Sequence, residues 1–125
     1  MPRVLVVDDD PQVLRLLRVN LELEGYDVAS ATNGEAALAE CADKVPDLVV
    51  CDVMMPGMDG YEVVRRLRKD GATSKLPIVM LSAKAMRSEM RQGFDAGADE
   101  YVTKPFDPTE LIDVVARLLR NPSRT

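Results

Sequence analysis

The feature that most constrains the fold of this chain is an alternation between short apolar runs and longer segments with helical periodicity. Three of the runs, Val4–Val7, Leu48–Cys51 and Ile78–Leu81, are apolar at every position. Strands buried on both faces have such continuous runs, whereas a strand with one solvated face alternates between apolar and polar residues. Two weaker runs, Tyr26–Ala29 and Tyr101–Val102, complete a set of five predicted strands.

Each predicted strand is followed by a segment that has the spacing of an amphipathic helix. The first helix is predicted to begin at Asp10-Pro11, a favoured N-cap residue followed by proline, and to end at Gly25. Asn33-Gly34 and Asp107-Pro108 predict the starts of the second and fifth helices. Apolar residues mark one face of the last three helices, at Val63, Val64 and Leu67, at Met86, Met90 and Phe94, and at Leu111, Val114, Val115, Leu118 and Leu119.

Five strand–helix pairs in strict alternation predict an α/β fold, a mostly parallel, doubly wound sheet with helices on both faces. The connections between parallel strands should be right-handed. The 125 residues are about one domain's worth of polypeptide. We expect one domain over residues 1–121, followed by a polar tail over 122–125 that has the composition expected at the start of a linker.

Composition narrows the functions that such a domain can have. The chain has 16 basic and 21 acidic residues and a net charge of −5, which does not favour direct binding to nucleic acid. It has no histidine, so catalytic triads, general bases and metal sites that need histidine are excluded. Its two cysteines, Cys41 and Cys51, are too few for a disulfide scaffold or a four-thiolate zinc site.

The sequence predicts neither a membrane span nor a secretory leader. No apolar run approaches the ~20 residues of a membrane-spanning helix. The N-terminal residues Met1–Leu5 do not begin the long apolar region and small-residue cleavage site of a signal peptide. We therefore expect a cytoplasmic protein without a membrane partner.

Polar side chains follow the apolar runs at the carboxyl ends of the predicted strands. Asp8 and Asp9 follow the first run, Asp52 the third, Ser82 the fourth and Lys104 the fifth. Because ligands bind at the carboxyl ends of the strands in an open parallel sheet, these side chains are expected to share one crevice. Each also has an ordinary alternative, since an aspartate after a strand often caps a helix and a lysine there can simply face solvent.

Taken together, these residues indicate a phosphoryl site with a hard metal ion. Carboxylates gathered in one pocket repel one another, so the set requires a cation. Oxygen ligands without histidine or cysteine suit Mg²⁺ or Ca²⁺. A metal ion and a lysine can neutralise phosphoryl oxygens, and a carboxylate beside them can act as the nucleophile in phosphoryl transfer.

Five segments carry a combination of motifs that is far more specific than any one of them alone. They are Val4–Asp9, Pro46–Asp52, Met54–Gly60, Pro77–Ala83 and Gly97–Phe106. In this order and at these spacings, they resemble the receiver domain of bacterial two-component response regulators. The resemblance covers about residues 3 to 120, which is nearly the whole chain.

This resemblance implies a flavodoxin-like (βα)5 fold with strand order 2-1-3-4-5, and it implies roles for the polar residues. Asp52 would be the phosphoacceptor. Asp9, Asp52 and the backbone carbonyl of Met54 would ligate Mg²⁺ directly, while Asp8 would act partly through water. Lys104 would pair with the phosphoryl oxygens.

The same resemblance implies a conformational switch. Ser82 would hydrogen-bond the phosphoryl group in the active state, and Tyr101 would turn inward with it from an outward resting position. The side chains of Met54 and Lys84 stand at positions that tune phosphoryl lifetime in the family. The Lys104–Pro105 peptide bond is expected to be cis, because in the family this bend aims the lysine into the pocket.

The resemblance also implies partners. A sensor histidine kinase or a phosphotransfer protein would supply the phosphoryl group, and a downstream effector protein or domain would bind a face made by the fourth helix, fifth strand and fifth helix. Such a protein is not an enzyme for a separate substrate, since it catalyses only its own phosphorylation and dephosphorylation. A phosphorylation-dependent dimer remains open, although Val114 stands where many winged-helix members carry a dimer-face arginine, four residues after Glu110.

Three other functions remain open at this point. A Mg²⁺-dependent phosphatase of the haloacid dehalogenase type also uses an aspartate nucleophile, and Asp8-Asp9-Asp10 satisfies its Asp-x-Asp pattern. That family needs a further acidic pair after its lysine, whereas the acidic residues after Lys104 lie at helix-cap and helical positions. A flavin-binding electron carrier shares the fold, but the acidic loops would repel a flavin phosphate. A degenerate, unphosphorylated receiver is the third alternative, although every required residue is present.

Overall fold

A computed structural model describes residues 1–83 and 87–120, with the backbone alone in 87–89. Strands and helices alternate along the described chain, as β1 (Arg3–Val7), α1 (Pro11–Leu23), β2 (Asp27–Ala31), α2 (Gly34–Asp43), β3 (Leu48–Asp52), α3 (Gly60–Lys69), β4 (Ile78–Ser82), α4 (Arg87–Ala96), β5 (Glu100–Thr103) and α5 (Pro108–Arg120). Lys84, Met86 and the predicted tail 122–125 lie outside the described residues. Among the helices described, none is long and apolar enough to cross a membrane.

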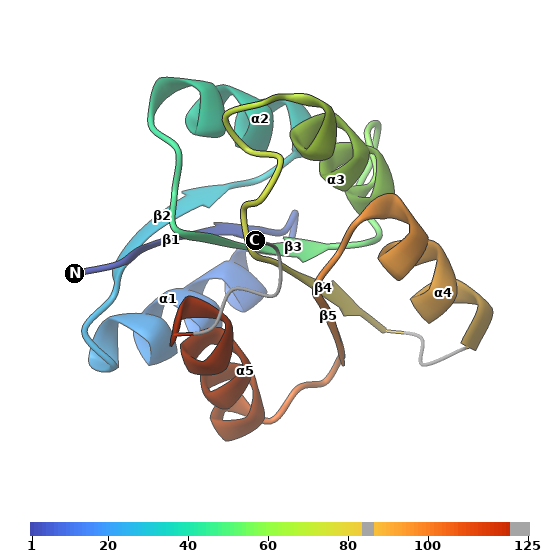
Figure 1. The fold of residues 1–125 in the computed structure, drawn as a ribbon. Coiled ribbons are helices and arrows are strands. Elements are labelled where there is room, and N and C mark those ends of the chain that lie inside the picture. The colour runs from blue at the N-terminus through green and yellow to red at the C-terminus, as the bar shows by residue number, and fades with distance from the viewer. Residues whose placement is uncertain (84–86, 121–125) are drawn as a thin grey trace.

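The five strands are all parallel, and their order in the sheet is β2-β1-β3-β4-β5. Helices α1 and α5 cover one face of the sheet, and α2, α3 and α4 cover the other (Figure 1). The predicted doubly wound sheet and its 2-1-3-4-5 order are therefore confirmed. Because β3 lies between β1 and β4, its last residue, Asp52, is at the centre of the carboxyl edge.

Side chains of the inner strands alternate between two apolar layers, which explains the continuous apolar runs. In β1, Val4 and Val6 pack with residues of α1 and α5, whereas Leu5 and Val7 pack with residues of α2 and α3. All four side chains are at most 1% exposed. Because burial of such a side chain contributes about 1.5–3 kcal/mol relative to exposure, the inner strands are firm supports for the residues at their ends.

The predicted helix starts are confirmed by their capping bonds. The Asp10 side chain accepts a hydrogen bond of 2.9 Å from the N–H of Gln12, and Pro11 is the first residue of α1. Asn33 caps α2 by accepting a hydrogen bond of 2.7 Å from a backbone N–H three residues later. Asp107 does the same for α5, with a bond of 2.9 Å two residues later. These local bonds satisfy donors that the first turn of each helix leaves unpaired.

The second strand is Asp27–Ala31 rather than the predicted Tyr26–Ala29. Tyr26 is absent from the strand because its N–H bonds to the carbonyl of Leu21 at 3.2 Å, in the C-terminal cap of α1. Gly25 makes this cap with a φ of 92°, a conformation that favours glycine. At the other end, pairing with β1 extends the strand by Ser30 and Ala31, of which Ala31 is buried in the core.

The apolar face of α4 differs from the prediction at Phe94. Met90 packs against the core, but Phe94 is 43% exposed, and its ring centroid is 6.5 Å from that of Tyr101. Gly93 lies close to the sheet, since a β carbon there would lie 3.2 Å from both Met80 Sδ and the Tyr101 ring, and Ala96 is buried. Positions four residues apart rotate by about 40° around a helix, so the third position of the series turns away from the sheet.

Candidate functional site

Four charged side chains meet at the carboxyl edge of the sheet. Asp8 and Asp9 follow β1, Asp52 ends β3, and Lys104 follows β5. The Lys104 Nζ lies 2.8 Å from Asp8 Oδ2 and 3.2 Å from Asp52 Oδ1. The peptide bond between Lys104 and Pro105 is cis, which confirms that prediction. The structure thus brings together the acidic residues and the lysine that the parallel sheet was expected to gather.

The three aspartates differ in burial and in bonding. Asp8 is fully buried, Asp52 is 4% exposed, and Asp9 is exposed. Asp8 uses one oxygen to accept from the N–H of Asp10 at 2.9 Å and the other to accept from Lys104. Its carboxylate is therefore held by the start of α1 and by the lysine, while Asp9 lies on the solvent side of the cluster.

Burial raises the pKa of the Asp52 carboxyl above its usual range, and the charge of Asp8 raises it further. The positive charge of Lys104 and a hydrogen bond from the Met54 N–H act in the opposite direction without cancelling these effects. Burial also acts to lower the pKa of Lys104, but its hydrogen bond to Asp8 and the charge of Asp52 outweigh burial, so the pKa is raised. The lysine is consequently protonated at neutral pH.

The donor atoms of this cluster suit a hard divalent cation. Each of the three aspartates has a carboxylate oxygen within 4.8 Å of the others, and one ammonium group cannot balance all three. Carboxylate and carbonyl oxygens are the ligands that Mg²⁺ prefers in proteins. The Met54 side chain is 65% exposed, and a role for its carbonyl as a metal ligand stays a prediction.

The loop after β3 is held close to Asp52. The N–H of Val53 donates to the carbonyl of Leu81 at 2.9 Å, and the N–H of Gly60 donates to the carbonyl of Val53 at 2.8 Å. Asp59 is the N-cap of α3, so the helix begins directly beside the end of the strand. Gly60 ends the Met54–Gly60 motif and is the first residue of α3, where the absence of a side chain permits close packing.

The predicted switch residues, Ser82 and Tyr101, lie on the neighbouring strands β4 and β5. Ser82 is 1% exposed, and its carbonyl accepts from the Lys104 N–H at 2.6 Å. Tyr101 is 7% exposed and packs between the sheet and Gly93 and Phe94 of α4. In this structure Tyr101 therefore occupies the inward position, not the outward one expected of the resting form. The missing side chain at Gly93 provides the room for its ring.

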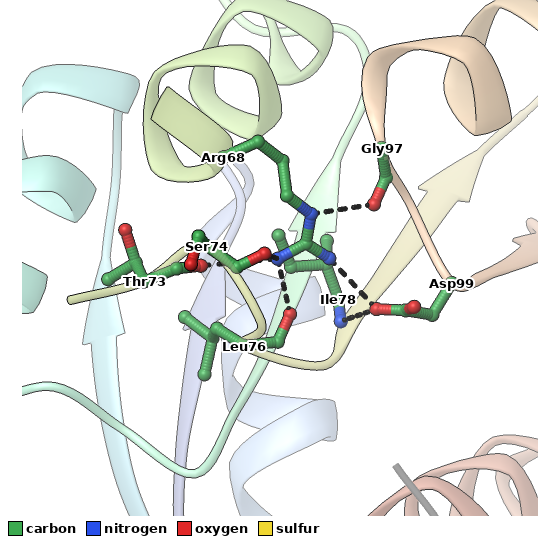
Figure 2. Close-up of polar contacts among 7 residues, drawn as sticks. All are labelled: Arg68, Thr73, Ser74, Leu76, Ile78, Gly97 and Asp99. Carbon is green, nitrogen blue, oxygen red and sulfur yellow. Dashed lines mark hydrogen bonds and ion pairs between the residues drawn. The ribbon is translucent and has the colours of Figure 1, made fainter. Parts of the chain in front are cut away.

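A second charge cluster, which is partly buried, lies at the amino-terminal edge of the sheet, and no local sequence pattern marks it (Figure 2). Arg68 of α3 forms an ion pair of 2.9 Å with Asp99, which accepts from the N–H of Ile78 at 2.8 Å. The guanidinium also donates to four backbone carbonyls, those of Thr73, Ser74, Leu76 and Gly97. Because Asp99 lies 31 residues away, nothing in the local pattern distinguishes Arg68 from the exposed Arg66.

The comparison with family models identifies this arrangement. The model described as response regulator receiver domain matches residues 4–116. The chain therefore belongs to the receiver domain family of response regulators, and the resemblance noted in the sequence is confirmed.

Individual relatives agree with this assignment. RpaA, a DNA-binding dual master transcriptional regulator of Synechocystis sp., is 45% identical over 124 residues, which are 99% of this chain and 52% of the relative. The transcriptional regulatory protein ResD of Bacillus subtilis is 46% identical over 123 residues, 98% of this chain and 50% of the relative. The chain thus spans about half the length of these curated relatives.

Solved structures of the same kind share the fold. The chemotaxis protein CheY4 of Vibrio cholerae has a TM-score of 0.90 at 32% identity, covering 94% of this chain and 98% of that chain. The receiver domain of the Francisella response regulator 1452 has a TM-score of 0.90 at 35% identity, with 96% and 98% covered. The chain is a receiver domain of a two-component response regulator, a signalling protein for which a phosphoacceptor role fits and the phosphatase alternative is not favoured.

Proposed function

We propose that Asp52 is the phosphoacceptor of this receiver domain, and that a sensor histidine kinase or a phosphotransfer protein supplies the phosphoryl group. The observation that carries the proposal is the position of Asp52 at the end of the central strand, buried, with Lys104 Nζ 3.2 Å from its carboxylate. Asp8 and Asp9 stand beside it with their own carboxylates. These residues match the chemistry of a nucleophile, a fixed cation and a metal-binding pair.

In the transfer step, one oxygen of Asp52 attacks phosphorus and forms an O–P bond, while the P–N bond to the donor histidine breaks. The electron pair of that bond stays on the imidazole, and the product is an acyl phosphate on Asp52. Lys104 offers positive charge to the phosphoryl oxygens, and its hydrogen bond to Asp8 holds it in place. A small donor such as acetyl phosphate would react in the same way, with acetate as the leaving group.

The proposed Mg²⁺ ligands are Asp9, Asp52 and the backbone carbonyl of Met54. Bound there, the ion would neutralise charge on the phosphoryl oxygens. Asp8 has both oxygens engaged, by the Asp10 N–H and by Lys104, which supports a role for Asp8 through water rather than as a direct ligand.

Phosphorylation is proposed to act through Ser82 and Tyr101 on the face made by α4, β5 and α5. A phosphoryl group adds strong acceptor oxygens and negative charge, and Ser82 ends the strand next to β3. Because Tyr101 is already inward here, drawing Ser82 toward the phosphoryl group would act by raising the population of the inward position relative to an outward one. The face would then be read by a downstream effector protein or domain.

The proposed setting is the cytoplasm, with no membrane partner and no direct contact between this chain and nucleic acid. The net charge of −5 supports the last point. Within the face made by α4, β5 and α5, Arg117 forms an ion pair of 2.5 Å with Glu100 of the same chain, and Val114 carries no charge. These features favour an effector contact over a charged dimer of the winged-helix type.

The proposal is tested by incubating the protein with Mg²⁺ and acetyl phosphate and measuring its intact mass. We expect one labile phosphoryl adduct, which Asp52→Asn abolishes. Asp59→Asn is the matched control, since it makes the same chemical change at an exposed N-cap in the loop after β3. An adduct on Asp52→Asn that forms at the parent's rate would show that another residue is the acceptor.

The switch is tested by comparing backbone amide chemical shifts with and without beryllofluoride, a mimic of the phosphoryl group. We expect large changes from Ser82 through Tyr101 into α4, and none in Asp52→Asn. Changes confined to the loops around Asp8, Asp52 and Lys104 would show that the site is not coupled to the α4, β5 and α5 face.

A further inference from the structure

We propose that Gly60 is a positioning residue for phosphoryl transfer, because its missing side chain lets the first turn of α3 rest on the main chain of Asp52. This inference rests on the proposed role of Asp52. A β carbon placed on Gly60 would overlap the carbonyl oxygen of Asp52. It would also lie 2.9 Å from the Val53 Cα and 3.0 Å from the Asp52 carbonyl carbon, well inside the usual separation of about 3.5–4.0 Å.

The conformation of Gly60 is not the reason for glycine at this position. The described glycines with positive φ are Gly25, Gly57 and Gly97, and Gly60 is not among them. An alanine could adopt the backbone conformation of Gly60 but would not fit the space. Substitution by alanine therefore tests the close approach of helix and strand alone.

The strand end cannot readily move away from an added side chain. Asp52 pairs with Leu81 of β4, and the N–H of Val53 continues the ladder to the Leu81 carbonyl at 2.9 Å. On the other side, Cys51 pairs with Val7 of β1. Movement of the strand end would break these bonds and shift the reactive carboxylate relative to the aspartates after β1 and the lysine after β5.

The start of α3 is held just as firmly. Three residues of its first two turns, Tyr61, Val63 and Val64, are buried in the core. The loop before it also packs closely on α2, since a β carbon on Gly34 would lie 2.9 Å from Val63 Cγ2 and 3.0 Å from Met58 Sδ. An added side chain at position 60 therefore has no free direction. It must disturb either the Asp52 end of β3 or the loop that carries the Met54 carbonyl.

The consequence is that Gly60 acts through Asp52 and Met54 rather than by touching the phosphoryl group. A displacement of about 1 Å at a reacting group can lower a rate by about 100-fold. The Gly60→Ala variant should therefore lose phosphorylation and Mg²⁺ affinity out of proportion to its loss of stability.

The experiment compares Gly60→Ala with Gly71→Ala, for which a β carbon would meet no atom within 4 Å and φ is not positive. Urea unfolding establishes conditions in which each variant is folded. Under those conditions the rate of phosphorylation by acetyl phosphate is followed by intact mass, and Mg²⁺ binding is measured by calorimetry. We expect Gly60→Ala to phosphorylate about 10–100-fold more slowly and to bind Mg²⁺ more weakly, and Gly71→Ala to match the parent in both.

Several outcomes would overturn the inference. If folded Gly60→Ala has the parent's rate and Mg²⁺ affinity, Gly60 serves packing alone. If Gly60→Ala does not fold in buffer, both measurements are made with the stabilising osmolyte trimethylamine N-oxide, which favours the folded state, and the parent's rate and Mg²⁺ affinity under those conditions would refute the proposal. If the parent itself takes up no phosphoryl group on Asp52, the proposed function fails before the role of Gly60 is reached.

Discussion

The two edges of the sheet each hold a cluster of charged side chains, and the two clusters are built differently. At the amino-terminal edge, Arg68 and Asp99 form one ion pair, and the remaining donors of the guanidinium bond to backbone carbonyls (Figure 2). At the carboxyl edge, the single ammonium group of Lys104 pairs with Asp8 and Asp52, and Asp9 has a carboxylate oxygen within 4.8 Å of theirs. The first cluster is neutral as a pair, whereas the second has a surplus of negative charge.

This difference separates a cluster that stabilises the fold from one that is prepared for a ligand. Arg68 joins α3, the start of β4 and the segment before β5, so its bonds hold together elements that are distant in sequence. The carboxyl-edge cluster leaves its exposed member, Asp9, on the solvent side. A buried surplus of charge is costly without a cation, which makes the carboxyl edge the place where Mg²⁺ and a phosphoryl group can gain most.

The largest expected effect on stability comes from disrupting the amino-terminal cluster. We expect Arg68→Gln to lower the free energy of unfolding by up to about 3–5 kcal/mol, because it removes one partner of an ion pair whose side chains are only 11% and 3% exposed. Urea unfolding measures this loss. Arg66→Gln is the control, because the Arg66 side chain is 55% exposed and pairs with Glu62, so its loss should be under about 1 kcal/mol. Equal losses in the two variants would show that burial of the Arg68 pair has no special weight.

The second expected effect on stability comes from binding Mg²⁺ to the carboxyl-edge cluster. We expect Mg²⁺ to raise the free energy of unfolding by about 2.7 kcal/mol at about 100 times its Kd, because the ion binds the folded chain alone. Thermal unfolding with and without MgCl₂ measures the rise. Asp9→Ala should lose it, while Arg68→Gln should keep it in full. A rise of the same size in Asp9→Ala would mean that Mg²⁺ binds elsewhere.

A smaller effect follows from the raised pKa of Asp52. Burial of the carboxyl is the main cause of this increase, and the negative charge of Asp8 adds to it. A carboxyl with a higher pKa in the folded than in the unfolded chain contributes stability that is present below the unfolded pKa and lost as pH rises through the folded pKa. Without divalent cations, the parent should therefore gain stability relative to Asp52→Asn as the pH falls from about 7 toward about 4. Urea unfolding of both proteins across this pH range measures the difference. A difference that stays constant with pH would contradict the expectation.

The smallest expected effect tests whether the two clusters act independently. Under conditions in which Arg68→Gln is fully folded, we expect it to be phosphorylated by acetyl phosphate within about twofold of the parent's rate, because distant sites without shared partners act almost independently. Intact mass measured over time provides both rates. A much slower reaction in the folded variant would show that the amino-terminal cluster also positions the site.

Much of the fold was determined by the sequence itself, because the relevant interactions are local. Asp10 and Asp107 cap helices through bonds that reach two residues along the chain, and Gly25 ends a helix through its own backbone conformation. The apolar runs predict buried parallel strands, and a parallel sheet necessarily gathers the residues at its strand ends. The sequence alone therefore predicts that Asp8, Asp52 and Lys104 lie close together.

Tertiary structure decided what depends on partners far along the chain. Arg68 looks like any other basic residue of α3 until the segment with Asp99 folds against it, 31 residues away. Phe94 has helical spacing, but its exposure depends on how closely Gly93 lets α4 approach the ring of Tyr101. The need for Gly60 arises from a contact with the main chain of Asp52, and a main-chain contact leaves no trace in the sequence of its partner.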